Sequence, residues 1–333
     1  MKEHCDDTAD FKVKGDMRRM NKRTISVFIV LNLIAAAVLG GCAGQSEKIS
    51  DSRKSGVTAP AESEVIAALP QQEEQIPEED PVIEEVDFSE YFEGLNGAAV
   101  IYDPSANRYQ IYNQETALTQ RSPCSTFKII SSLIGLENGI IVPGDSTRTW
   151  SGEIFWNEDW NKDIAFEDAF QTSCVWYFRQ VINEIGTDIM QEELDKLQYG
   201  NRDISDWEGR QNTNEDNRAL TGFWIESSLK ISPKEQTEVM ERIFGSHSEY
   251  SKETQDKLKQ VMLVSDQTVP GLAVYGKTGQ GAEGNITADC WFTGFADKDG
   301  SRLYFCVYLG RTDGADLSSA KARETAMQIL ADY

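Results

Sequence analysis

The stretch Ser122–Ile130, SPCSTFKII, places a hydroxyl and an amine three residues apart at the start of an apolar helical pattern. Residues i and i+3 share one face of a helix, so the side chains of Ser125 and Lys128 can meet there. The first turn also favours negative charge that develops on the serine oxygen, because it is the positive end of the helix dipole. The stretch therefore predicts either a serine nucleophile with a lysine base, or only a helix cap followed by a surface lysine.

The elements around this stretch predict an α+β fold. The helix from Ser125 ends at Glu137, before an Asn-Gly pair suited to a left-handed cap. Strands at both ends of the domain, with helices between them, indicate one antiparallel β-sheet that is flanked by helices and carries a helical subregion. We expect strands at 97–102, 108–112, 272–277, 289–295 and 302–310, and further helices at 163–185, 190–197, 233–244, 250–263 and 317–331.

Composition divides the chain of 333 residues into a tether and a globular domain. Residues 43–87 are rich in Pro, Gln, Ser and Glu and poor in aromatic residues, which predicts an acidic, disordered linker. Residues 88–333 are globular in pattern and form one catalytic domain. The net charge of −23 argues against a nucleic-acid partner, because phosphate contacts need clustered Lys and Arg.

The N-terminus, residues 1–42, has the order of an export signal. Basic residues between Arg18 and Arg23 precede an apolar run at 25–38, and small residues lead to Cys42. The order Leu-Gly-Gly-Cys resembles a bacterial lipobox, in which cleavage leaves the Cys42 thiol carrying lipid. The alternative is an uncleaved transmembrane anchor, although the run is shorter than the ~20 residues that a span needs. Both alternatives predict an exported domain tied to a membrane on its extracytoplasmic side.

Histidine cannot easily serve as the base of a serine nucleophile in this chain. The only histidines are His4, within the predicted signal, and His247, whose neighbours indicate a surface loop. If Ser125 is the nucleophile, Lys128 must be its base. A free lysine has a pKa of about 10.4, so an apolar environment must lower the pKa of Lys128.

Two further motifs follow in the order known for active-site serine enzymes that react with β-lactams. Thr172–Trp176 (TSCVW) opens a helical stretch, and Tyr275–Gly279 (YGKTG) ends a predicted strand. S-x-x-K, a second serine motif and K-T-G in this order are far more specific than any one of them. In the last motif, glycine would let a substrate approach the backbone, and Lys277 with Thr278 could hold a carboxylate.

With these motifs, residues 88–333 resemble a class D (oxacillinase-type) serine β-lactamase, of the penicillin-binding and serine β-lactamase superfamily. The middle motif, Ser173 to Val175, has the apolar third position of class D in place of the Asn of class A and of transpeptidases. Further stretches that match the family are 150–152 (WSG), 160–163 (WNKD), 199–201 (YGN), 223–226 (FWIE), 229–232 (LKIS) and 291–295 (WFTGF).

The resemblance implies that Ser125 attacks a β-lactam carbonyl and that Lys128, as a CO₂-derived carbamate, is the general base for acylation and deacylation. It implies an oxyanion hole made by the backbone N–H groups of Ser125 and Gln280, and proton relay by Ser173. The residues that it implies for binding the substrate are Lys277, Thr278, Gly279, Gln280 and Arg323, with Arg311 as a competitor for the place of Arg323.

The resemblance also implies an apolar pocket around the carbamate. Its members would be Val175, Phe178, Trp224 and Ile225, and the Trp224 indole N–H could hold the carbamate. Ordinary core packing is the alternative explanation for Val175, Phe178 and Ile225. We expect no metal and no cofactor other than CO₂, because no zinc-binding constellation of His and Cys is present.

Four cysteines remain in the exported domain. Cys290 and Cys306 lie on two arms of one predicted hairpin, and Cys124 and Cys174 each adjoin a candidate catalytic serine. Disulfide bonds are geometrically possible within either pair. We expect instead that all four are small buried hydrophobic residues.

Three functions suit these features. The first is a lipid-anchored hydrolase of penicillins. The second is a sensor that acylates without efficient release, although β-lactam receptors of this fold carry several membrane spans and an H-E-x-x-H protease segment, so this chain would need a partner. The third is a transpeptidase, against which Val175 and the Trp224 pocket argue.

Overall fold

The computed structural model describes residues 80–264, 269–284 and 286–333. The predicted export signal with Cys42, and the predicted linker up to residue 79, lie outside the described residues. None of the helices within the described ranges is long and apolar enough to cross a membrane.

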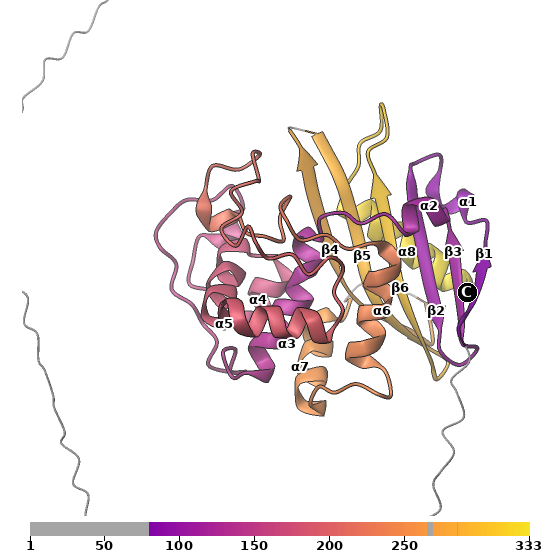
Figure 1. Ribbon diagram of the computed structural model, residues 1–333, viewed down its shortest axis with the longest axis horizontal. Helices are drawn as coiled ribbons and strands as arrows, with labels where there is room; N and C mark the ends of the chain where they lie inside the picture. Colours follow the sequence, from indigo (N-terminus) through magenta and orange to yellow (C-terminus); the bar gives the residue numbers. More distant parts are fainter. Residues whose placement is uncertain (1–79, 265–268, 285) are drawn as a thin grey trace, which may run out of the picture. The chain divides into compact units, whose positions relative to one another are not determined.

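A six-stranded sheet in the order β1-β3-β2-β6-β5-β4 forms the centre of the domain (Figure 1). The strands β1 and β3 are parallel, and every other neighbouring pair is antiparallel. N-terminal and C-terminal strands meet where β2 pairs with β6, as the sequence predicted. The strands are β1 Val82–Glu85, β2 Gly97–Asp103, β3 Arg108–Tyr112, β4 Leu272–Glu283, β5 Ile286–Lys298 and β6 Ser301–Gly310.

Helices cover both faces of the sheet and form a subregion beside β4 (Figure 1). The helix α8 packs on β4, β5 and β6, while α6 packs on β2, β5 and β6. The helices α3, α4, α5 and α7 pack on one another next to β4. The helices are α1 Ser89–Phe92, α2 Gln114–Ala117, α3 Lys128–Glu137, α4 Phe166–Gln171, α5 Val175–Lys196, α6 Pro233–Phe244, α7 Lys252–Met262 and α8 Ser319–Asp332. The predicted α+β class with a helical subregion is confirmed.

Two hydrophobic cores lie on the opposite faces of the sheet. On one face, Phe292 and Phe305 pack with Ile329 of α8. On the other, Phe295 and Tyr304 belong to the larger core that α3, α5, α6 and α7 fill. Since α3 is buried within this larger core, the residues at its N-terminus are held rigidly against the edge of the sheet.

The domain begins earlier than the sequence analysis placed it. Strand β1 lies inside the segment predicted as a disordered linker, so the predicted boundary at residue 88 is wrong by about six residues. Backbone bonds hold β1 in place, from Val82 N–H to Asn107 O at 2.9 Å and from Val86 N–H to Ile111 O at 3.0 Å. All four side chains of β1 are exposed, so composition alone gave no sign of a strand.

Candidate active site

The candidate nucleophile and its base lie where a 3₁₀ turn passes into an α-helix. Residues Cys124–Phe127 form the turn, and α3 begins at Lys128, whereas the sequence predicted a helix from Ser125 throughout. Side chains at i and i+3 eclipse in a 3₁₀ helix, which brings them closer than in an α-helix. Lys128 Nζ donates a hydrogen bond to Ser125 Oγ at 2.9 Å. The two functional groups are therefore in direct contact, as the sequence predicted.

Lys128 is an amine buried without a carboxylate partner among the described residues. The side chain is 1% exposed, and the Phe178 ring centroid lies 5.6 Å from Nζ. Desolvation lowers the pKa of Lys128 to about 8, although the neighbouring thiols of Cys174 and Cys124 act in the opposite direction. At pH 7 roughly one amine in ten is then neutral, against about one in a few thousand for a free lysine.

Ser173 lies at a strained turn between α4 and α5. Its N–H bonds Phe170 O at 3.2 Å, and Cys174 N–H bonds Ala169 O at 2.8 Å, which is the Schellman pattern that ends a helix. Ser173 takes the left-handed position of this motif with φ +58°, where glycine is the usual residue. One helix predicted for 163–185 is thus two helices, and the break was missed because no glycine marks it.

The Ser173 hydroxyl has no hydrogen-bond partner within the part of the chain that the structure describes, although its oxygen is buried. Burying a polar atom without a partner costs free energy, and such atoms are rare in folded proteins. An unpaired hydroxyl beside a cavity is thus available to a ligand, which fits the predicted proton relay.

The K-T-G motif packs directly against the nucleophile turn. A Cβ added at Gly279 would lie 2.9 Å from both Pro123 O and Thr126 Cγ2, so only glycine allows β4 to approach so closely. The sequence analysis assigned this glycine to substrate approach, and the structure adds a packing requirement. Lys277 is 5% exposed and donates to Thr278 O at 3.1 Å. Its pKa is well below the usual value, first through desolvation and then through repulsion by Lys128.

The open edge of β4 faces the nucleophile turn. Strand β4 ends the sheet, and Val264 N–H bonds Val274 O on the side away from β5. Backbone groups in an antiparallel strand alternate between the two sides, so Gln280, six residues after Val274, directs its N–H to the same open edge. This direction fits its predicted place in an oxyanion hole. Ser319 N–H, at the start of α8, holds the Gln280 side-chain oxygen at 3.0 Å.

A cavity of about 500 Å³ brings most of the predicted site residues together. Lys128, Phe178 and Trp224 are fully buried and do not line this cavity. The predicted site residues on its wall are Ser125, Ser173, Val175, Ile225, Thr278, Gly279 and Gln280.

The two arginines proposed for the substrate carboxylate lie outside this wall. Arg323 lines a separate cavity of about 110 Å³, together with Lys277 and Thr278. Arg311 lies in a different cavity, with Glu283 at 3.9 Å. Arg323 is thus the nearer of the two to the K-T-G motif, and its role in carboxylate binding stays a prediction.

The four residues predicted for the carbamate pocket belong to the larger core or pack against it, and among them Phe178 is the one whose ring lies over the Lys128 amine. Trp224 is 1% exposed and stacks on Phe127 at 6.0 Å between ring centroids. The neighbouring Gly222 is required here, because an added Cβ would collide with the Trp224 ring. Phe178 lies over the amine, as described above, while Val175 and Ile225 are half-buried on the cavity wall.

All four cysteines of the domain are free and buried, as expected. In the register of β5 and β6, Cys290 lies opposite Leu309 and Cys306 lies opposite Thr293, so these two cysteines are not cross-strand partners. Among the described residues, no group of three or more His, Cys, Asp or Glu side chains could hold a metal ion.

Sequence reasoning missed several residues of the site that come from the segment 207–227. Asn214, Leu220 and Glu226 line the cavity. Glu226 ends the stretch 223–226 (FWIE), in which only Trp224 and Ile225 were assigned a role. Asn214 and Glu226 bind Ala282 of β4, which is 68 and 56 residues away in the chain, so no local pattern marks either contact. Trp156 also lines the cavity and is 79% exposed.

Comparison with known proteins identifies the family. The profile of the penicillin binding protein transpeptidase domain matches residues 97–331. β-Lactamase OXA-1 of Escherichia coli is 33% identical over 246 residues, which cover 73% of this chain and 86% of the relative. Regulatory protein BlaR1 of Bacillus licheniformis is 28% identical over 250 residues, which cover 74% of this chain but only 39% of BlaR1. The chain thus spans about two fifths of the BlaR1 and MecR1 relatives that it matches.

Solved structures agree with this comparison. The C-terminal domain of the Bacillus licheniformis BlaR penicillin-receptor has a TM-score of 0.65 and 27% identity, covering 76% of this chain and 96% of that domain. A class D β-lactamase from Bacillus subtilis has a TM-score of 0.62 and 26% identity, covering 74% and 95%. The chain belongs to the penicillin-binding protein transpeptidase domain family, and its relatives include class D β-lactamases, as the sequence motifs indicated.

Replacement of Ser173 tests the strain at the second serine. Ser173→Gly and Ser173→Ala both remove the hydroxyl, but only glycine relaxes the left-handed backbone. We expect the glycine variant to be more stable than the alanine variant by about 1 kcal/mol in denaturant unfolding. Equal stability, or a more stable alanine variant, would show that the backbone is not strained at this position.

Replacement of Lys128 tests its burial. Below pH 8 the unfolded chain holds this proton more tightly than the folded one, so Lys128→Met should raise the free energy of unfolding by about 3 kcal/mol at pH 7 in CO₂-free buffer. Between pH 8 and 10.4 the folded wild type has lost this proton while its unfolded state still binds it, so a rise in pH increases the stability of the wild type. The difference between the two proteins should therefore shrink over that window, and a constant difference would contradict the lowered pKa.

Proposed function

We propose that this protein hydrolyses β-lactam antibiotics of the penicillin type through an acyl-enzyme on Ser125. The observation that carries the proposal is the contact of 2.9 Å between Ser125 Oγ and the buried Lys128 amine. A buried amine with a lowered pKa can accept the serine proton near neutral pH, which a surface lysine cannot. The class D β-lactamases among the relatives support the same reaction.

The residues of the cavity have separate tasks in this reaction. Ser125 Oγ attacks the lactam carbonyl while Lys128 takes its proton, and the N–H groups of Ser125 and Gln280 bind the oxyanion. The lactam C–N bond then breaks, and Ser173 passes a proton to the leaving nitrogen. Lys277 and Thr278, with Arg323, bind the substrate carboxylate. The proton that Lys128 took from Ser125 has by then passed through Ser173 to the nitrogen. Lys128 therefore takes a second proton from the water that attacks the Ser125 ester, and passes it to the released Ser125 oxygen.

The Lys128 pocket also suits CO₂ addition. Carbamylation needs a neutral amine in an apolar site, and the lowered pKa of Lys128 and the Phe178 ring supply both. The unpaired Ser173 hydroxyl offers a polar partner nearby. We propose that Trp224 and Ser125 would hold the carbamate, which would supply an anionic base for acylation and deacylation. No metal and no other cofactor enters this proposal.

A sensor is the second candidate function. The BlaR penicillin-receptor domain resembles the chain as closely as the class D enzyme does, with TM-scores of 0.65 and 0.62. A sensor would form the same acyl-enzyme on Ser125 and keep it. Acylation of Ser125 is common to both functions, so only the rate at which the acyl group is hydrolysed from Ser125 separates them.

Turnover of a chromogenic cephalosporin and a penicillin tests the hydrolase. We expect continuous product formation that rises with added bicarbonate, and none with Ser125→Ala. Penicillin-labelled protein that accumulates to one equivalent without turnover, at saturating bicarbonate, would contradict hydrolysis and favour the sensor. Transfer of a D-Ala-D-Ala peptide to an acceptor amine would instead support a transpeptidase.

We also propose that the protein is exported and lipid-anchored to the extracytoplasmic side of a membrane through Cys42. The basic, apolar and Leu-Gly-Gly-Cys segments support this localisation. In cells grown with a radiolabelled fatty acid, the wild type should carry label in the membrane fraction, and Cys42→Ala should not. Equal labelling of the two proteins would contradict the lipobox.

A further inference from the structure

Glu226 makes a contact that the proposed reaction does not use. Its Oε1 accepts the Ala282 N–H of β4 at 2.5 Å, and its Oε2 accepts from Asn214 Nδ2 at 2.6 Å. Asn214 Nδ2 also donates to Ala282 O at 3.0 Å. Both backbone groups of Ala282 are therefore bound by the segment 207–227, which contributes to the cavity wall.

Ala282 is the next residue after Gln280 whose backbone groups face the open edge of β4. The strand alternates in direction, and Val274, Gln280 and Ala282 all fall on the same side. A β-bulge lies between Gly281 and Ala282, where the partner residues on β5 shift from Asp289 to Thr287. Because a bulge disrupts the ladder locally, this end of β4 needs support from outside the sheet.

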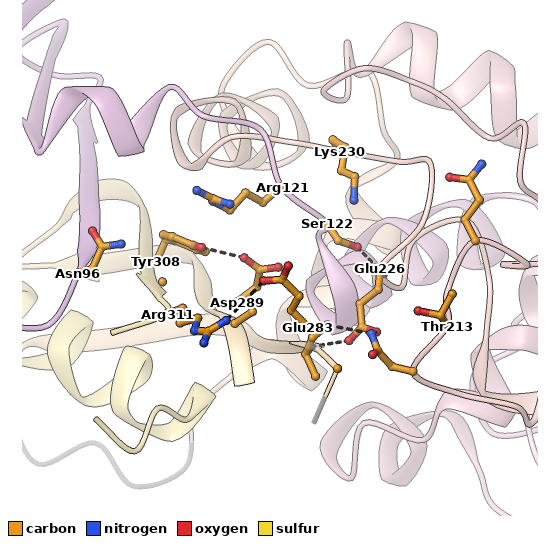
Figure 2. A pocket seen from close by; sticks show the side chains of 16 residues that line it. Asn96, Arg121, Ser122, Thr213, Glu226, Lys230, Glu283, Asp289, Tyr308 and Arg311 are labelled. Carbon is orange, nitrogen blue, oxygen red and sulfur yellow. Dashed lines mark hydrogen bonds and ion pairs between the residues drawn. The ribbon is translucent and has the colours of Figure 1, made fainter. Parts of the chain in front are cut away.

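The backbone of Glu226 is bound to the nucleophile segment. Its N–H donates to Ser122 Oγ at 2.7 Å, and Ser122 Oγ donates to Trp224 O at 3.0 Å. Trp224 O also accepts the Cys124 N–H at 2.9 Å, one residue before Ser125. Figure 2 shows Glu226 beside Ser122, with its carboxylate directed away from Ser122 toward the end of β4.

The local backbone indicates a position under constraint. Glu226 adopts φ +51°, a left-handed conformation that non-glycine residues take only when their surroundings compel it. In this conformation the N–H of Glu226 bonds Ser122 and its carboxylate bonds Ala282, so the two contacts hold the residue from both sides. Such strained residues concentrate at functional sites.

From these contacts we infer that Glu226 is a positioning residue, which fixes the Gln280 N–H of β4 relative to Ser125. It joins the two segments that carry the predicted oxyanion donors: its backbone holds the turn before Ser125, and its carboxylate holds the strand two residues past Gln280. The inference rests on the proposed serine chemistry. A displacement of one donor by about 1 Å lowers a reaction rate by about a hundredfold.

Three variants separate this role from a general effect of charge. Glu226→Ala removes both acceptors, while Glu226→Gln keeps one oxygen for the Ala282 N–H. Glu283→Gln is the matched control, because this substitution also removes one negative charge. Glu283 follows Ala282 on β4, and its side chain is 78% exposed beside Arg311. For each protein we would measure Ser125 acylation by a penicillin, the substrate concentration at half-maximal rate, and hydrogen exchange of the Ala282 amide by NMR.

We expect faster Ala282 exchange and acylation that is slower by about tenfold to a hundredfold in Glu226→Ala, with little change in the half-saturating concentration. Glu226→Gln should lie between this variant and the wild type, and Glu283→Gln should match the wild type. Acylation within twofold of the wild type despite faster Ala282 exchange would overturn the inference, as would unchanged exchange. If Glu226→Ala loses cooperative unfolding, the same criteria apply to Glu226→Gln.

Failure of the proposed function has a different result. In that case the wild type itself would not be acylated at Ser125, whatever the behaviour of the variants. The exchange of the Ala282 amide does not depend on catalysis, and unchanged exchange in Glu226→Gln would overturn the inference on its own.

Discussion

A lysine amine buried against a serine hydroxyl, with no carboxylate partner in the part of the chain that the structure describes, is the constraint that organises this domain. Keeping Lys128 in this place costs about 3 kcal/mol at neutral pH, estimated from the fall in its pKa to about 8. The larger hydrophobic core, in which α3 is buried, has to offset that cost. What the protein gains is an amine 2.9 Å from Ser125 Oγ that is neutral in roughly one molecule in ten at pH 7, far more often than a free lysine.

The backbone around this pair is strained at three points. Cys124, Ser173 and Glu226 have φ values of +49°, +58° and +51°, although none is a glycine. Each adjoins or forms part of the cavity wall, and each is held by hydrogen bonds from a different element. The Cys124 N–H ties the nucleophile turn to Trp224 O. The site therefore depends on contacts between segments distant in sequence more than on any one helix.

The sequence predicted those parts of the structure that local chemistry determines. The Ser125–Lys128 spacing is local, and α6 begins and ends as predicted because Pro233 and a serine cap fix its first turn. Strand β1 was missed because all four of its side chains are exposed, so no apolar pattern marks it. The break at Ser173 was missed because a strained serine takes the place of glycine. Glu226 lies 56 residues from Ala282 in the chain, so no local pattern could predict the contact between them.

Titration of the Lys128 amine tests the central claim most directly. Lysine labelled with ¹³C at Cε gives one NMR signal per side chain, and the signal absent from Lys128→Met identifies this residue. In CO₂-free buffer the account predicts a transition of this signal at a pH of about 8. A transition near 10.5, the ordinary value for lysine, would show that burial does not raise the neutral fraction of the amine above that of a free lysine, and would contradict its role as the base.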